Sequence, residues 1–291
     1  MKKVLGIVLL VLLGLITAAW LVFRFSGDPM AQSPQAIADF FETHGVQHTM
    51  TTYTSEGRQM HYVSAGADTL PTVLFIHGSP GAWDAYLRYF GDTALTRRFR
   101  LISVDRAGYG QSDPPKAEPS MALQTRRLAP VLATVPGGVP LIVVGHSYGG
   151  PVAARLAMEY PDRVSGLLLL AGIFDPKLES RFWVQRPLLS PALDWLLAPI
   201  MRTSNEEMVP LRSQLEAMLP LWPRIRACTI IIQGDKDMLV KPGNADFAAS
   251  HIVQAPVSVV RLPDENHFIV WSQQELIVRS ILEIAAHIGA V

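Results

Sequence analysis

Six short and mostly apolar runs limit what this chain can fold into. The segments between them carry the apolar spacing of helices, so the chain alternates between strand and helix. Runs of this kind are typical of strands that helices cover on both faces, as in a parallel sheet. The predicted strands are Thr72–Ile76, Leu101–Val104, Leu141–Val144, Leu167–Leu170, Thr229–Ile232 and Val257–Leu262.

A further pair of strands precedes these six. Gln47–Tyr53 and Arg58–Val63 are predicted to pair in the antiparallel sense and to lead into the sheet. The sequence therefore predicts an α/β protein with an eight-stranded, mostly parallel sheet and helices on both of its faces.

The composition is that of a folded protein without a nucleic-acid partner. Apolar residues make up 49% of the 291 residues, which is enough to form a core and excludes a disordered chain. The 25 basic and 25 acidic residues cancel, whereas a nucleic-acid-binding protein usually has a basic excess. The single cysteine, Cys228, excludes an internal disulfide and a cysteine-rich metal site.

The first 25 residues have the properties of a membrane segment. Lys2 and Lys3 precede Val4–Phe23, a stretch without a charge that as a helix would span about 30 Å, the thickness of the hydrocarbon core. We expect residues 1–25 to form a transmembrane signal anchor that leaves the rest of the chain outside the cytoplasm. Residues 26–46 are predicted to be a tether with one short helix. The alternative is a signal peptide cleaved near Thr17-Ala18-Ala19, which would give a secreted protein.

The third of the six strands ends in a recognisable motif. Leu141–Val144 is followed by Gly145-His146-Ser147-Tyr148-Gly149, which is a G-x-S-x-G sequence at a strand-to-helix turn. Such a turn projects the Ser147 hydroxyl beside the N-terminus of the next helix, where the Tyr148 N–H can stabilise negative charge. The alternative role for Ser147 is that of an ordinary helix N-cap.

Together with this motif, several other segments of the chain resemble the α/β-hydrolase superfamily. His77-Gly78-Ser79-Pro80-Gly81 matches the H-G-x-P-G loop of that family, and Asp105–Ser112 matches its D-R-x-G-x-G-x-S loop. Gly234-Asp235-Lys236-Asp237 and Asn266-His267-Phe268 follow the last two strands. The resemblance implies an α/β-hydrolase core formed by residues 47–173 and 228–291. No cofactor is expected, because nothing in the sequence resembles a metal or nucleotide site.

The resemblance also implies a catalytic triad in the chain order that this fold uses. Ser147 would be the nucleophile, His267 the general base and then acid, and Asp237 the group that orients His267. The oxyanion hole would be formed by the backbone N–H groups of Ser79 and Tyr148.

Several neighbouring polar residues compete with these assignments or are assigned structural roles. Asp235 and Asp175 are alternatives to Asp237, although the G-x-x-D spacing favours Asp237. His267 could instead be a loop histidine packed on Trp271. We expect His77 to shape the oxyanion loop and Asp105 to hold its own loop through hydrogen bonds. The His146 side chain is predicted to point away from the site.

Residues 174–227 depart from the alternation of strands and helices. They contain seven prolines and three tryptophans, Trp183, Trp195 and Trp222. In this fold such an insertion resembles a helical lid over the active site. Its apolar residues would either line an acyl pocket or seat the lid on the core.

The expected activity is that of a carboxylic ester hydrolase acting through an acyl-enzyme on a small or medium apolar substrate. Epoxide hydrolases and haloalkane dehalogenases use aspartate where this chain has Ser147, and the lid contains no tyrosine of the kind that epoxide hydrolases carry.

Three alternatives remain open at this stage. A carbon–carbon bond hydrolase could use the same triad. A proline iminopeptidase could also do so, with Glu206, Glu207 or Glu216 binding the substrate's amino group. The chain could instead be a non-catalytic binding module on the same fold. The oligomeric state is not predicted.

Overall fold

The computed structural model describes residues 31–179 and 196–290, together with scattered positions within 12–22 and 187–193. Most of the predicted membrane segment lies outside the described residues, as do Trp183 and Trp195. Among the residues that are described, no helix is both long enough and apolar enough to cross a membrane.

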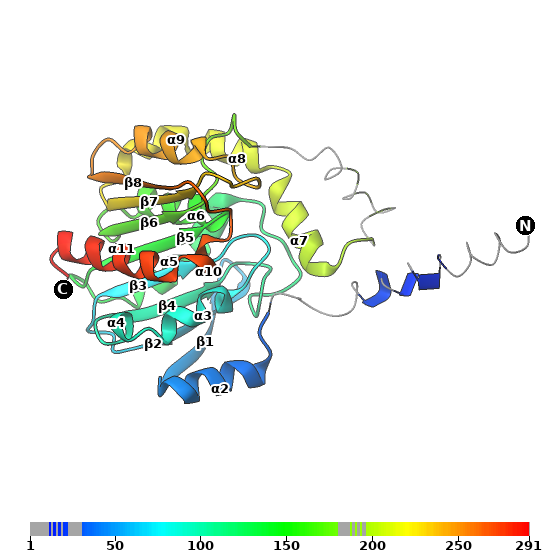
Figure 1. The fold of residues 1–291 in the computed structure, drawn as a ribbon, viewed down its shortest axis with the longest axis horizontal. Coiled ribbons are helices and arrows are strands. Elements are labelled where there is room, and N and C mark those ends of the chain that lie inside the picture. The colour runs from blue at the N-terminus through cyan, green and yellow to red at the C-terminus, as the bar shows by residue number, and fades with distance from the viewer. Residues whose placement is uncertain are drawn as a thin grey trace, which may run out of the picture.

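One eight-stranded sheet forms the centre of the molecule (Figure 1). Its strand order is β1-β2-β4-β3-β5-β6-β7-β8, with antiparallel pairing only between β1 and β2 and between β2 and β4 among the described strands. The predicted eight-stranded, mostly parallel sheet is therefore confirmed. The strands are β1 His48–Ser55, β2 Arg58–Ala65, β3 Thr72–Ile76, β4 Arg100–Asp105, β5 Leu141–His146, β6 Gly166–Leu170, β7 Cys228–Gly234 and β8 Val257–Leu262.

The first two strands form the predicted antiparallel pair. Ser55 lies opposite Arg58, so only Glu56 and Gly57 make the turn. Both have positive φ angles, 49° and 73°, as the two central residues of a type I′ hairpin turn require.

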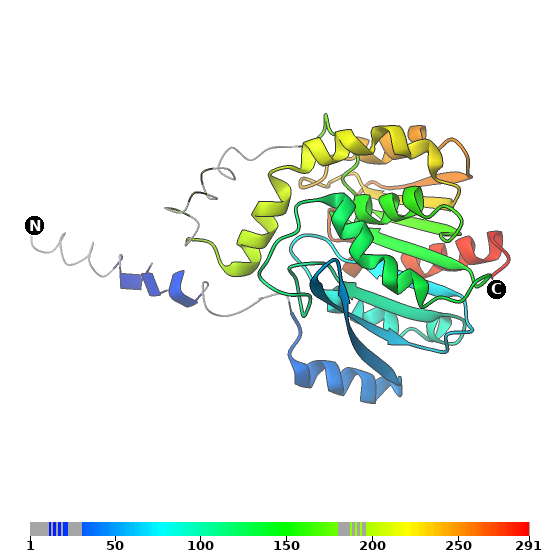
Figure 2. The ribbon, with the colours of Figure 1, turned by 180° about the vertical axis from the view of Figure 1, so that it is seen from behind.

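Alternate side chains of each central strand enter separate cores on the two faces of the sheet. In β3, Leu74 and Ile76 face one core, whereas Val73 and Phe75 face the other. The first core is covered by α5 Met121–Ala133, α6 Gly149–Glu159, α8 Leu211–Met218 and α9 Gly243–His251 (Figure 2). The second is covered by α2 Pro34–His44, α3 Leu87–Phe90, α4 Thr93–Thr96, α10 Ile269–Ser272 and α11 Gln274–His287.

Helix α2 lies within the segment predicted to be a tether. Ser33 caps its N-terminus by accepting a hydrogen bond from the Ala36 N–H, and Pro34 occupies the first helical position. Phe41 is buried in the second core. The C-terminal part of residues 26–46 is thus packed on the domain.

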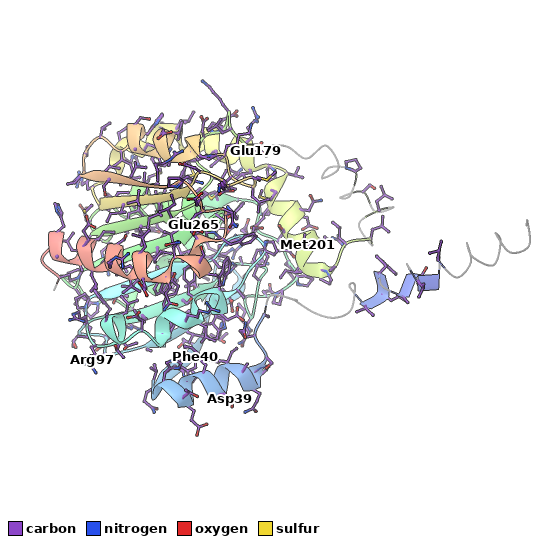
Figure 3. The ribbon with its side chains drawn as sticks, viewed as in Figure 1. Asp39, Phe40, Arg97, Glu179, Met201 and Glu265 are labelled. Carbon is purple, nitrogen blue, oxygen red and sulfur yellow. The ribbon has the colours of Figure 1, made fainter. Side chains whose placement is uncertain are left out.

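Residues 196–227 contain two α-helices and a 3-10 helix, which have different surroundings. Helix α8 and the 3-10 helix Leu219–Arg224 seat on the core, where the Trp222 ring packs edge-on against Phe174. Helix α7, Pro199–Met208, lies beyond the strands' carboxyl ends, and its Met201 side chain is exposed (Figure 3). Trp222 therefore packs on the core and is not among the described residues that line the cavity above Ser147.

Candidate active site

Ser147 occupies a strained turn between β5 and α6. Its φ angle is +54°, in the left-handed region that residues with a side chain rarely adopt. The turn is held because the Ser147 N–H donates to the Leu170 carbonyl at 2.9 Å and the Gly150 N–H donates to the Ser147 carbonyl at 2.9 Å. These two backbone hydrogen bonds therefore fix the position of the Ser147 backbone, from which its side chain projects.

The two glycines of the motif are required by close backbone contacts. A Cβ atom at Gly145 would lie 2.3 Å from the Gly149 carbonyl oxygen, and one at Gly149 would lie 2.3 Å from the Ile76 carbonyl oxygen. Neither position can hold a side chain unless the backbone of β3, β5 or α6 moves.

The loops after β5, β7 and β8 bring the three predicted triad residues together. His267 Nε2 lies 2.9 Å from Ser147 Oγ, and His267 Nδ1 lies 2.7 Å from Asp237 Oδ2. This geometry suits transfer of the Ser147 proton to His267 Nε2 while Asp237 holds the proton on Nδ1.

The surroundings of Asp237 favour its anion. Burial alone would raise the pKa of Asp237, but the hydrogen bond and charge of His267 and the N–H groups of Val240 and Leu239 outweigh it and lower that pKa. Those two N–H groups donate to Oδ1 at 2.8 and 2.9 Å, and Gln233 Nε2 donates to Oδ2 at 3.2 Å. The carboxylate is thus fixed in orientation as well as in charge.

The two alternative acids make other contacts. Asp235 is about one-third exposed and pairs with Arg261 at 2.6 Å. Asp175 accepts a hydrogen bond from the Lys177 N–H. No contact among the described residues joins either carboxylate to His267, so the geometry favours Asp237.

The prediction that His146 points away from the site is wrong. Its Nε2 lies 3.0 Å from the His267 carbonyl oxygen, its ring packs 4.9 Å from the His267 ring, and it lines the cavity above Ser147. Burial lowers the pKa of His146 to about 3, so the ring is neutral and its Nε2–H donates to the His267 carbonyl. The sequence gives no sign of this contact, because it joins the His146 side chain to a backbone carbonyl of a separate loop.

The loop after β3 lies against Ser147. A Cβ atom on Gly78 would be 3.0 Å from the Ser147 Cβ, and Gly78 and Ser79 both line the cavity. Burial and the nearby Arg106 hold the pKa of His77 well below its usual value. The neutral His77 ring donates from Nδ1 to the Gly78 carbonyl at 2.7 Å and accepts at Nε2 from the Arg106 N–H at 2.9 Å.

Asp105 has the structural role expected of it. Its Oδ1 accepts from the Trp83 N–H, and its Oδ2 accepts from the Gln111 N–H and faces His61 Nδ1 at 2.8 Å. The carboxylate therefore joins its own loop to the neighbouring elements.

A cavity of about 440 Å³ opens above Ser147 and His267. Its walls are mostly apolar, and Met208, the last residue of α7, is one of them. No group of three or more residues within the described part of the chain could hold a metal ion. The apolar lining residues are Pro80, Ala82, Ala85, Tyr86, Ile173, Met208, Leu239, Val240, Phe268, Val270 and Trp271.

None of the three glutamates considered for amine binding is among the described residues that line this cavity. Glu207 is fully buried and pairs with Arg106, and Glu206 pairs with Arg202 on its own helix. Glu216 is exposed on α8.

The topology of the sheet and the comparisons with known proteins agree on the class of fold. Residues 71–197 match the family model described as alpha/beta hydrolase fold. The chain has the α/β-hydrolase fold. A solved structure of a membrane phospholipase A, described as a novel bacterial virulence factor, shares this fold with a TM-score of 0.65 and 21% identity over the whole of both chains.

Two curated relatives carry different activities. Epoxide hydrolase 1 of Caenorhabditis elegans is 35% identical over a segment that covers 38% of this chain and 27% of that protein. Proline iminopeptidase PfmaB of Pestalotiopsis fici is 25% identical over 77% of this chain and 95% of that protein. The chain therefore spans only about a quarter of the length of the first relative.

Proposed function

We propose that the protein is a carboxylic ester hydrolase that works through an acyl-enzyme on a small or medium apolar ester. One observation carries the proposal: Ser147 Oγ, His267 and Asp237 form a hydrogen-bonded chain of 2.9 and 2.7 Å at the floor of a mostly apolar cavity.

The proposed reaction has two stages. Ser147 Oγ attacks the ester carbonyl while its proton passes to His267 Nε2, and the oxyanion is stabilised by the N–H groups of Ser79 and Tyr148. The C–O bond to the alcohol then breaks, and His267 returns the proton to the leaving oxygen. Water attacks the acyl-enzyme with His267 again as base, which releases the acid and restores Ser147.

The chemistry of the nucleophile favours an ester over an epoxide substrate. An aspartate that opens an epoxide forms an ester, and water can hydrolyse that ester at its carbonyl. A serine that opened the same ring would form an ether, which has no carbonyl for water to attack. Ser147 therefore separates this chain from the activity named for its epoxide hydrolase relatives.

The positions of the three lid glutamates favour an ester over a peptide with a free amino terminus, although the cavity lining does include Asp84, whose carboxylate accepts from the Gln32 N–H at 2.6 Å. A buried ammonium group needs a charged partner, because leaving it uncompensated is strongly unfavourable. Glu206, Glu207 and Glu216 are not among the described cavity residues, and Glu207 is already paired. A carbon–carbon bond hydrolase has no comparable observation in its favour.

We further propose that residues 1–25 anchor the enzyme in a membrane with the hydrolase outside the cytoplasm and with residues 174–227 as a lid. The uncharged run Val4–Phe23 supports the anchor. Gln32 lines the cavity and its N–H donates to Asp84 Oδ2 at 2.6 Å. The nine residues from Phe23 to Gln32 can span at most about 30 Å, so Gln32 and the cavity wall that it forms would lie within that distance of the membrane.

A substrate panel tests the proposed reaction. Full-length protein is assayed with p-nitrophenyl esters of graded acyl length, with styrene oxide and with proline p-nitroanilide. We expect turnover of the esters at a kcat/KM at least about a hundred times that for the other two compounds. A preference for the epoxide or the anilide would contradict the proposal, and no turnover of any compound would favour the binding module.

A further inference from the structure

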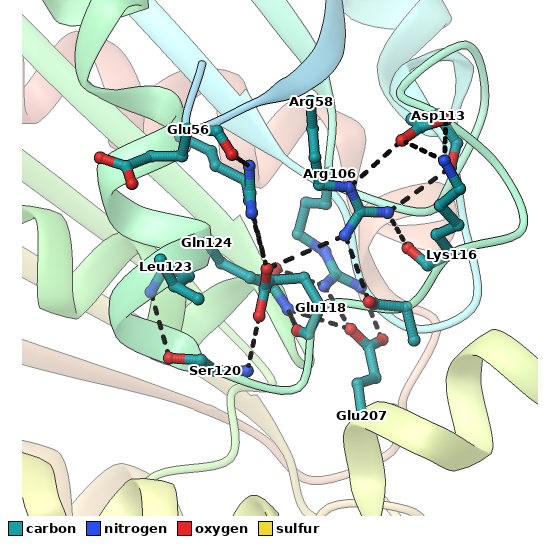
Figure 4. A network of polar contacts seen from close by, with 12 residues as sticks. Glu56, Arg58, Arg106, Asp113, Lys116, Glu118, Ser120, Leu123, Gln124 and Glu207 are labelled. Carbon is teal, nitrogen blue, oxygen red and sulfur yellow. Dashed lines mark hydrogen bonds and ion pairs between the residues drawn. The ribbon is translucent and has the colours of Figure 1, made fainter.

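Arg106 lies beneath the oxyanion loop and is almost completely buried. Its Nε donates to the His77 carbonyl at 2.9 Å, and its Nη2 donates to the Gly78 carbonyl at 2.8 Å. The same guanidinium pairs with both carboxylate oxygens of Glu207, at 2.8 and 3.0 Å (Figure 4). Since Glu207 belongs to α7, this bidentate pair joins the proposed lid to the oxyanion loop.

The Gly78 carbonyl belongs to the same peptide group as the Ser79 N–H. A peptide group is planar, and in its trans form the C=O and the N–H point in opposite directions. Two donors, Arg106 Nη2 and His77 Nδ1, hold this carbonyl and so fix the direction of the Ser79 N–H. A carbonyl that accepts from a cation is also polarised, which makes the N–H of the same amide a stronger donor.

Glu207 is held by several partners besides Arg106. The Tyr109 hydroxyl donates to Glu207 Oε1 at 2.6 Å, and Gln124 Nε2 donates to Oε2 at 3.1 Å. The Tyr109 hydroxyl also lies 3.0 Å from Ser79 Oγ. Helix α7 also contacts Ser79 directly, because Ser204 Oγ lies within hydrogen-bond distance of Ser79 Oγ, at 2.8 Å.

We propose that Glu207 is a positioning residue for the oxyanion hole. Acting through Arg106, it orients and polarises the Gly78–Ser79 peptide, so that docking of α7 completes the donor that stabilises the tetrahedral intermediate. This inference rests on the proposed ester hydrolysis. It gives Glu207 a role in the reaction, although Glu207 is not among the described residues that line the cavity.

The matched pair Glu207→Gln and Glu206→Gln tests the inference. Glutamine keeps the size of Glu207 but removes the charge that balances Arg106. We expect kcat for p-nitrophenyl ester hydrolysis to fall by about 10- to 100-fold with little change in KM, which is part of the effect of losing an oxyanion donor. Glu206→Gln, on the same helix but partly exposed and paired with Arg202, should change kcat less than about twofold.

A second readout separates positioning from a general loss of structure. An alkyl boronic acid forms a tetrahedral adduct on a catalytic serine, so its affinity reports the oxyanion hole. In Glu207→Gln this affinity should fall by the same factor as kcat/KM, while a ketone analogue of the substrate that forms no adduct should bind as before. A merely structural role would change both affinities or neither.

The double variant Arg106→Met, Glu207→Leu keeps the test decisive if the single variant does not fold. Replacing both members of a buried ion pair by apolar residues often preserves stability. We expect this variant to fold and yet to show the same fall in kcat and in boronic acid affinity. Wild-type kcat in either folded variant would overturn the inference. Absence of ester hydrolysis in the wild type would instead remove the proposed function.

Discussion

Replacing Ser147 by alanine is expected to reduce kcat for ester hydrolysis by about 10⁴- to 10⁶-fold, because the alternative is attack by water without an acyl-enzyme. The fold should survive. The Ser147 side chain makes one described hydrogen bond, to His267, and alanine adopts the same φ of +54° no less readily than serine. Initial rates on a p-nitrophenyl ester and a thermal unfolding curve measure the two effects.

Ser213→Ala is the matched control for this experiment. Ser213 lies exposed on α8, and its hydroxyl donates only to the Pro210 carbonyl among the described groups. Its removal should leave kcat within about twofold. If Ser147→Ala retained more than a few per cent of the rate while folded, another residue would have to be the nucleophile.

Asp237→Asn should reduce kcat by about 10⁴-fold. An asparagine amide facing His267 Nδ1 would favour the tautomer of His267 that carries its proton on Nε2. In that tautomer Nε2 can no longer accept the Ser147 proton. The change is close to isosteric, so the N–H groups of Leu239 and Val240 can still donate to the side-chain oxygen. Steady-state kinetics at saturating ester would measure the loss.

Two other aspartates serve as controls for the choice of acid. Asp235→Asn removes an ion pair with Arg261 near the surface, and Asp175→Asn alters a loop that follows β6. Each should leave kcat within about threefold. A severe loss in Asp175→Asn together with a mild one in Asp237→Asn would assign the orienting acid to Asp175.

The sheet could be predicted because each central strand is buried on both faces. Leu141–Val144 and Leu167–Leu170 have no polar residue, which only a strand covered by helices tolerates. Val257–Leu262 differs, since β8 has a single neighbour and its Ser258 and Arg261 are exposed. Its apolar residues were nevertheless sufficient to place it.

The candidate triad was predictable for a related reason. Ser147 follows β5 directly, Asp237 and His267 lie in the loops after β7 and β8, and the carboxyl ends of parallel strands meet at one edge of the sheet. The resemblance to the α/β-hydrolase superfamily implies which three residues form the triad, and the order of the strands explains why they lie at one edge of the sheet. The G-x-S-x-G motif also contains the two glycines, Gly145 and Gly149, that the turn at Ser147 requires.

Contacts between distant segments could not be predicted in this way. The pairing of Arg106 with Glu207 joins positions 101 residues apart, and Glu207 looks like any other glutamate on an exposed helix. From the sequence, Glu207 is therefore expected to be a possible substrate ligand rather than the partner of a buried arginine. The orientation of His146 was missed for the same reason, because it depends on a carbonyl in a separate loop.

Trapping the nucleophile tests the central claim most directly. Full-length protein is titrated with a fluorophosphonate, ester hydrolysis is followed in parallel, and the adduct is located by peptide mass spectrometry. We predict one adduct per chain, on Ser147, with activity lost in proportion to labelling. Ester hydrolysis that persisted after complete labelling of Ser147, or an inactivating adduct on a different residue, would contradict a serine hydrolase acting through Ser147.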